Sequence, residues 1–192
     1  MLPDTSKCSK TVVLCDVDGD PRWDQAMLLT GASIRKVKGD RETLMQAVQS
    51  ADIACIAWSD GYNEASIPIS ELVEIGHAAG VKVVVDGASR LPPVSNLWDF
   101  TGVGADVAIF SCGKAMRGPQ TGGIMIGTNE LIKGARANGS PNEAAVCRAM
   151  KSSKETIVGV VTAVEDFVAE QLSMEVRLAQ EVFLFVRLLE RS

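Results

Sequence analysis

The sequence predicts an α/β fold in which a mainly parallel sheet is flanked by helices. Short apolar runs, typical of buried strands, alternate along the chain with helical segments of about ten residues. This alternation is typical of parallel sheets with right-handed crossover connections. The 192 residues, of which 46% are hydrophobic, are enough to bury a sizeable core as one domain.

The first part of the chain predicts three strand–helix pairs. We expect strands over residues 11–15, 33–37 and 53–58, and helices over residues 22–30, 41–50 and 70–79. Gly31 and Gly80 are expected to end the first and third helices, because glycine readily adopts the left-handed conformation of a helix C-cap. Asp40 is the expected N-cap of the second helix.

The second part contains two apolar runs that each end beside a chemically useful side chain. Residues 81–86 predict a buried strand that ends on Asp86, and residues 107–110 predict another that leads into a turn carrying Lys114. A glycine-rich turn then leads into a further apolar run. Helices are expected over residues 95–100, 129–137 and 155–191, with a turn at 102–104. Residues 182–189 are apolar nearly all round and would need cover from another segment or subunit.

Composition excludes several classes of function. The net charge of −5 and the pI near 5.0 argue against nucleic-acid binding through a basic face. The five scattered cysteines indicate reduced intracellular thiols rather than disulfides or a zinc site. The sequence begins without the apolar core of a signal peptide, and no apolar run approaches a membrane span. We therefore expect a soluble, cytoplasmic protein with no membrane partner.

Three other motifs contain residue types that occur in functional sites. His77 is the only histidine, which excludes a Ser-His-Asp triad or a multi-histidine metal site, and we expect it to be a surface or packing residue. Asp16 and Asp18 resemble the nucleophile loop of haloacid-dehalogenase-type phosphatases, but a solvated turn is the better interpretation; a calcium loop fails on the positions of its glycine and proline. Lys114 is not in a phosphate-binding P-loop, because no glycine opens the motif. No metal is expected.

Asp86 and Lys114 together match the requirements of a pyridoxal phosphate site. A lysine amine condenses with the cofactor aldehyde, and a carboxylate keeps the pyridine nitrogen protonated so that the ring can accept electrons. The alternative for the lysine stretch taken alone is a solvated lysine in a surface loop.

The sequence also resembles a known family of enzymes. The resemblance lies in residues 83–97 (VVVDGASRLPPVSNL), 104–127 (GADVAIFSCGKAMRGPQTGGIMIG), 138–142 (NGSPN) and 147–167 (CRAMKSSKETIVGVVTAVEDF). These segments resemble the fold-type-I pyridoxal phosphate enzymes, in particular the L-seryl-tRNA(Sec) selenium transferases and the D-glucosaminate-6-phosphate ammonia-lyase-like proteins. The resemblance implies the aspartate aminotransferase-like fold, with pyridoxal 5'-phosphate as the cofactor.

The resemblance covers the central portion of such an enzyme. It implies that residues 1–150 form the cofactor-binding large domain, truncated at its N-terminal side, and that residues 151–192 are a helical segment leading towards a missing small domain. A first phosphate-binding turn and a residue that stacks on the cofactor ring are not recognisable. The implied activity is that of a lyase or transferase acting on an amino acid or amino-sugar acid, with its active site at a homodimer interface. The alternative is an inactive, truncated paralogue that acts as an interaction subunit.

The resemblance assigns roles to individual residues. It makes Lys114 the Schiff-base lysine and Asp86 the partner of the ring nitrogen. Ser111 falls where a hydroxyl can reach the cofactor phosphate, and Arg117 and Gln120 line the same turn, where Arg117 could hold an anion.

Two further residues fall in the family's second basic segment. The resemblance implies that Arg148 and Lys151 hold a substrate phosphate or carboxylate, although structural salt bridges are the alternative for both. Ser89 and Arg90, which follow Asp86 closely, are expected only to orient it.

Overall fold

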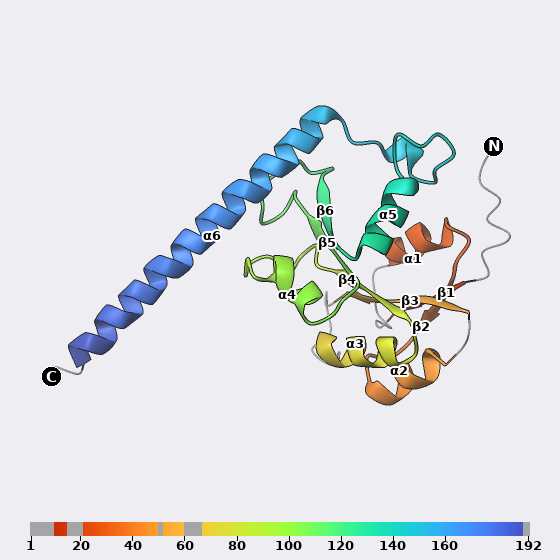
Figure 1. The fold of residues 1–192 in the computed structure, drawn as a ribbon, viewed down its shortest axis with the longest axis horizontal. Coiled ribbons are helices and arrows are strands. Elements are labelled where there is room, and N and C mark those ends of the chain that lie inside the picture. Colours follow the sequence, from red (N-terminus) through yellow and green to blue (C-terminus); the bar gives the residue numbers. More distant parts are fainter. Residues whose placement is uncertain (1–9, 15–20, 50–51, 60–66, 190–192) are drawn as a thin grey trace.

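The computed structural model describes residues 10–14, 21–49, 52–59 and 67–189, and its centre is a six-stranded sheet of order β2-β1-β3-β4-β5-β6 (Figure 1). The strands are β1 (Thr11–Leu14), β2 (Ser33–Lys36), β3 (Ile53–Ser59), β4 (Lys82–Asp86), β5 (Val107–Ser111) and β6 (Gly123–Gly127). The helices are α1 (Pro21–Leu28), α2 (Arg41–Ala47), α3 (Ile69–Ala78), α4 (Asn96–Gly102), α5 (Asn129–Ala137), the short 3-10 helix η2 (Arg148–Met150) and α6 (Lys154–Leu189). The predicted Asp16–Asp18 motif lies outside the described residues.

The sheet confirms the predicted α/β fold with a mainly parallel sheet. Strands β1 to β5 pair in parallel, and β6 pairs with β5 in the antiparallel direction. The direction of β6, which the sequence left open, follows from its connection: residues 112–122 contain no helix with which to make a parallel crossover.

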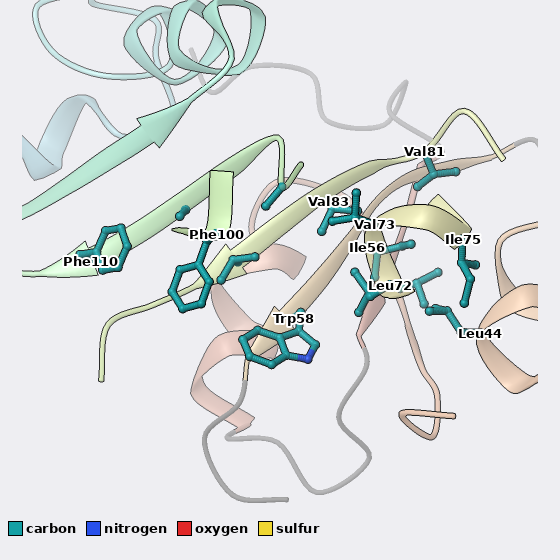
Figure 2. Close-up of a cluster of buried hydrophobic side chains, with 14 of the residues drawn as sticks. Leu44, Ile56, Trp58, Leu72, Val73, Ile75, Val81, Val83, Phe100 and Phe110 are labelled. Carbon is teal, nitrogen blue, oxygen red and sulfur yellow. The ribbon is translucent and has the colours of Figure 1, made fainter. Parts of the chain in front are cut away.

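The two faces of the sheet bury different sets of residues. Helices α2 and α3 lie on one side of the sheet, and α1 and α5 lie on the other (Figure 1). On the first side the core is formed by buried side chains from the strands and from α2, α3 and α4, among them Leu44, Ile56, Leu72, Val83 and Phe110 (Figure 2). On the second side Val12 and Ala57 form a smaller cluster, against which Met27 of α1 packs.

The predicted caps fix the helix ends. The Asp40 carboxylate accepts a hydrogen bond from the Thr43 N–H at 2.9 Å and is the N-cap of α2, as expected. Gly31 and Gly80 have φ values of 82° and 70° just beyond α1 and α3, which confirms their role at the helix C-termini.

The predicted turn at residues 102–104 is wrong in its first residue. Helix α4 includes Gly102, because the Val103 N–H still donates to the Asp99 carbonyl at 2.9 Å. Only Gly104, with a φ of 108°, carries the turn that leads into β5.

Helix α6 packs on the domain near its start and then extends away from it (Figure 1). Ser153 caps its start by accepting a hydrogen bond from the Thr156 N–H. Phe167 is 3% exposed and belongs to the main core, whereas Leu178 is 63% exposed. The side chains of residues 182–189, predicted to need cover, lie outside the description. None of the helices in the described ranges combines the length and the hydropathy of a membrane span.

Candidate functional site

The structure brings Asp86 and Ser111 to one face and one edge of the sheet. Asp86 is the last residue of β4 and Ser111 the last of β5, and these strands are parallel neighbours. Val83 and Val85 point into the core below the sheet, so that Asp86 faces the opposite side. Ile109 is paired with Asp86, and Ser111 lies two residues further along the same strand. Ser111 therefore shares the face of Asp86 at the carboxyl end of the sheet.

The turn that follows Asp86 is held tightly. The Asp86 Oδ1 atom accepts a hydrogen bond from the Ala88 N–H at 2.8 Å, and the Gly87 N–H donates to the Ile109 carbonyl at 2.8 Å. A Cβ atom at Gly87 would lie 2.6 Å from the Phe110 ring, a distance that only glycine permits. The backbone of the turn is consequently fixed against β5.

Lys114 reaches this turn from the next loop. Its Nζ atom donates a hydrogen bond to Ser89 Oγ at 2.7 Å. Burial raises the pKa of Asp86, and the Ala88 N–H and the positive charge of Lys114 offset part of that rise. The hydrogen bond to Ser89 places the Lys114 amine on the turn that follows Asp86, three residues along the chain from that carboxylate.

The loop that carries Lys114 is a compact, hydrogen-bonded structure. The Gly118 N–H donates to the Cys112 carbonyl at 2.8 Å, and the Cys112 N–H donates to the Gly122 carbonyl at 3.0 Å. The Cys112 side chain is fully buried, and burial raises the pKa of its thiol, which makes it a packing residue. The Gln120 amide donates to the Gly113 carbonyl at 2.9 Å and so closes the loop on itself.

Arg117 is paired with a residue of α6. Its guanidinium group forms an ion pair with the Glu170 carboxylate, and both side chains are largely exposed. Arg117 also has a φ of 55°, in the left-handed region that non-glycine residues seldom adopt. An anionic ligand at Arg117 would have to compete with Glu170.

Arg148 and Lys151 lie apart from these contacts. Arg148 belongs to η2, Lys151 follows it, and both precede α6. Within the described ranges, no hydrogen bond or ion pair joins either residue to Asp86 or Lys114.

Sequence reasoning missed two features of this edge of the sheet. One is the contact of Ser89 with Lys114, because the sequence suggested only that Ser89 orients Asp86. The other is the environment of Trp58 near the end of β3: the Arg90 guanidinium lies 5.9 Å from the centre of its ring. Trp58 is 4% exposed, and its indole N–H has no hydrogen-bond partner among the described residues. In the sequence, the signal for this environment is an aromatic residue near the end of a predicted strand.

A separate charged cluster occupies the opposite edge of the sheet. Asp106, 5% exposed, accepts a hydrogen bond from the Val83 N–H at 2.9 Å and pairs with Lys82 at 3.1 Å. His77 Nε2 lies 2.9 Å from Asp106 Oδ2, in a contact that joins α3 to the start of β5. His77 is therefore a structural residue at the surface, in line with the expected surface or packing role.

The chain is similar in sequence to one family of known proteins. The family model described as Aminotransferase class-V matches residues 22–168. The D-glucosaminate-6-phosphate ammonia lyase of Salmonella typhimurium is 26% identical over 176 residues, which cover 87% of this chain and 45% of that protein. The 5'-C-glycyluridine monooxygenase-decarboxylase of a Streptomyces species is 36% identical over 103 residues, or 54% of this chain and 24% of that protein.

The fold is also found among solved structures. A structure of D-glucosaminate-6-phosphate ammonia-lyase matches with a TM-score of 0.72 and 23% identity, over 86% of this chain and 47% of that chain. The chain thus spans less than half the length of these curated and solved relatives.

Proposed function

The chain belongs to the aminotransferase class-V family, and on that premise we propose that it is a lyase or transferase in which Lys114 and Asp86 hold the cofactor. The family membership confirms the resemblance to fold-type-I enzymes, and the cofactor is pyridoxal 5'-phosphate. The observation that carries the proposal is the hydrogen bond that holds the Lys114 amine on the turn directly after the half-buried Asp86, at the carboxyl edge of the sheet.

The side chains at this edge fit the chemical groups of the cofactor. Lys114 supplies the amine that an aldehyde requires. Asp86 supplies a carboxylate that can accept a hydrogen bond from a protonated ring nitrogen, and Ser111 supplies a hydroxyl for a phosphate oxygen. When bound, the cofactor supplies an electron-accepting ring that stabilises the negative charge formed when a bond to the substrate α-carbon breaks.

The residues of the chain then have distinct tasks. With the cofactor bound, Lys114 Nζ would be the base that takes the proton from the substrate α-carbon. Asp86 keeps the ring nitrogen protonated through the reaction. Arg117, when released from Glu170, holds an anionic group of the cofactor or the substrate, and Gln120 keeps the lysine loop closed.

The remaining assignments rest on the family resemblance. Arg148 and Lys151 are proposed to hold a substrate phosphate or carboxylate. The proposed substrate is a small amino acid or amino-sugar acid, since a net charge of −5 disfavours a tRNA-bound substrate. A homodimer with its active site at the interface, in the cytoplasm, completes the proposal. Activity on such a substrate is proposed for the whole enzyme, because the chain spans less than half the length of its relatives.

Borohydride reduction in the presence of pyridoxal phosphate tests the proposal. Reduction fixes the cofactor to the lysine that binds it, and peptide mass spectrometry identifies that lysine. We expect the adduct on Lys114 in the wild-type protein, its loss in Lys114→Ala, and its retention in the control Lys133→Ala, whose lysine is exposed on α5. A wild-type protein that forms no adduct would contradict the proposal and favour the inactive interaction subunit.

A further inference from the structure

The hydroxyl of Ser89 is a fixed partner for the amine of Lys114. The two atoms lie 2.7 Å apart, although the residues belong to different loops. We infer that Ser89 is a positioning residue that holds the Lys114 amine in place to receive the cofactor aldehyde. This inference rests on the proposed function and adds to it a residue to which the resemblance gives no role towards the lysine.

The location of the Ser89 hydroxyl is set by the backbone around it. The turn is anchored before Ser89 by the Gly87 N–H, which donates to β5, and by the Ala88 N–H, which donates to Asp86. It is anchored after Ser89 by the Arg90 carbonyl, which accepts a hydrogen bond from the Asn96 side chain at 2.6 Å. Serine adds only one rotatable bond before its oxygen, so the hydroxyl is the rigid member of the pair.

Lysine is the mobile member. Its amine stands at the end of a flexible four-carbon chain that loses considerable rotamer entropy when it is fixed. Lys114 is exposed, so that packing does not hold the end of its side chain. The contact with Ser89 therefore selects one amine position, on the turn that follows Asp86, from the many that the side chain would otherwise sample.

A hydroxyl suits this task better than a carboxylate. It accepts a hydrogen bond from the charged ammonium and donates one to the lone pair of the neutral amine, so that it holds lysine in both protonation states. A carboxylate would favour the charged form, which has no lone pair. Condensation of the neutral amine with an aldehyde forms a C=N bond and releases the aldehyde oxygen as water with the two amine hydrogens; nothing is oxidised or reduced.

The test compares two variants of the same shape. Ser89→Thr keeps the hydroxyl, and Ser89→Val replaces it by a methyl group. Each cofactor-free protein is mixed with pyridoxal phosphate, reduced with borohydride at increasing times, and analysed by peptide mass spectrometry. We expect Ser89→Thr to label Lys114 at a rate within about twofold of wild type, and Ser89→Val to label it about fivefold more slowly, as expected for one lost hydrogen bond. In Ser89→Val, a larger share of the label should fall on other lysines.

Controls separate positioning from folding and from the proposed function. Ser95→Ala removes a hydroxyl that makes no capping bond at the start of α4, and it should label like wild type. Ser89→Gly removes the hydroxyl without the branched side chain, and it should be as slow as Ser89→Val. Equal rates in Ser89→Thr and Ser89→Val, with labelling of Lys114 intact, would overturn the inference and leave the proposed function standing. Absence of an adduct in the wild type would instead overturn the proposed function, and the inference with it.

Discussion

Two aspartates at opposite edges of the sheet have opposite electrostatic environments. Asp86 ends β4 at the carboxyl edge, where burial raises its pKa and only the Ala88 N–H and the Lys114 charge offset that rise. Asp106 lies before the start of β5 at the other edge. Burial alone would raise the pKa of Asp106 as well, but hydrogen bonds from the Val83 N–H, His77 and Lys82 hold it below its ordinary value.

The difference shows how one kind of side chain can serve structure or function. The Asp106 carboxylate is nearly inaccessible to solvent, and its oxygens are paired with groups from α3 and β4. It therefore stabilises the fold. Among the described residues, Asp86 accepts one hydrogen bond, and its carboxylate has capacity for more. A carboxylate with unused hydrogen-bond capacity, near a lysine, is typical of functional sites. Such sites often lower the stability of the folded protein in return for activity.

The largest effect is expected from Asp106→Ala. The substitution leaves the Val83 N–H without its acceptor and removes the partner of Lys82 and His77, and such losses cost about 3 kcal/mol of the free energy of unfolding. Urea unfolding at neutral pH measures it. The control is Asp166→Ala at an exposed position of α6, with an expected change of about 0.5 kcal/mol or less. Equal losses in the two variants would break the contrast between the edges.

A smaller effect is expected in the response to acid. Because the pKa of Asp106 is lowered in the folded state, its contribution to stability is present above the ordinary carboxyl pKa and is lost as pH falls through the lowered value. Asp106→Asn should therefore lose less stability than wild type between about pH 5 and pH 2, although it starts lower at pH 7. Urea unfolding across this pH range gives the two slopes, and parallel curves would assign the acid sensitivity to other groups.

The smallest effect is expected from Asp86→Asn. Because burial raises the pKa of Asp86, the charged form costs stability above the ordinary carboxyl pKa, and the cost falls as the pH drops towards that value. The amide removes the charge and keeps an oxygen for the Ala88 N–H. We expect a gain of about 0.5 kcal/mol or less at pH 7, since the site is partly screened by solvent. Thermal unfolding compares the variant with wild type, and a loss comparable to that of Asp106→Ala would show that both edges are structural.

The sequence was sufficient for features that depend on neighbouring residues. Apolar runs located the strands. Asp86 at the end of β4 and Lys114 just beyond β5 could be expected at one edge of the sheet, because parallel strands end together. Asp40 could be identified as a cap because a cap acts within one helical turn. The division of the chain at residue 150 stays a prediction.

Contacts between distant segments were beyond the sequence. Ser89 meets Lys114 across 25 positions, and Arg117 meets Glu170 across 53, through the arrangement of separate loops and helices. The pairing of His77 with Asp106 arises in the same way, from the packing of α3 against β4. No periodicity encodes such pairs, since each depends on how already formed elements are placed.

The close packing of α6 against the loop that carries Lys114 has a mechanical consequence. A Cβ atom at Gly118 would lie 2.7 Å from the Ala163 side chain, and one at Gly159 would lie 2.8 Å from Pro119, so that helix and loop touch with no compressible side chain between them. Helix α6 has 36 residues, which makes it a rod of about 54 Å. A small tilt of the far end of the helix would pivot about these glycines and would shift the loop that carries Lys114.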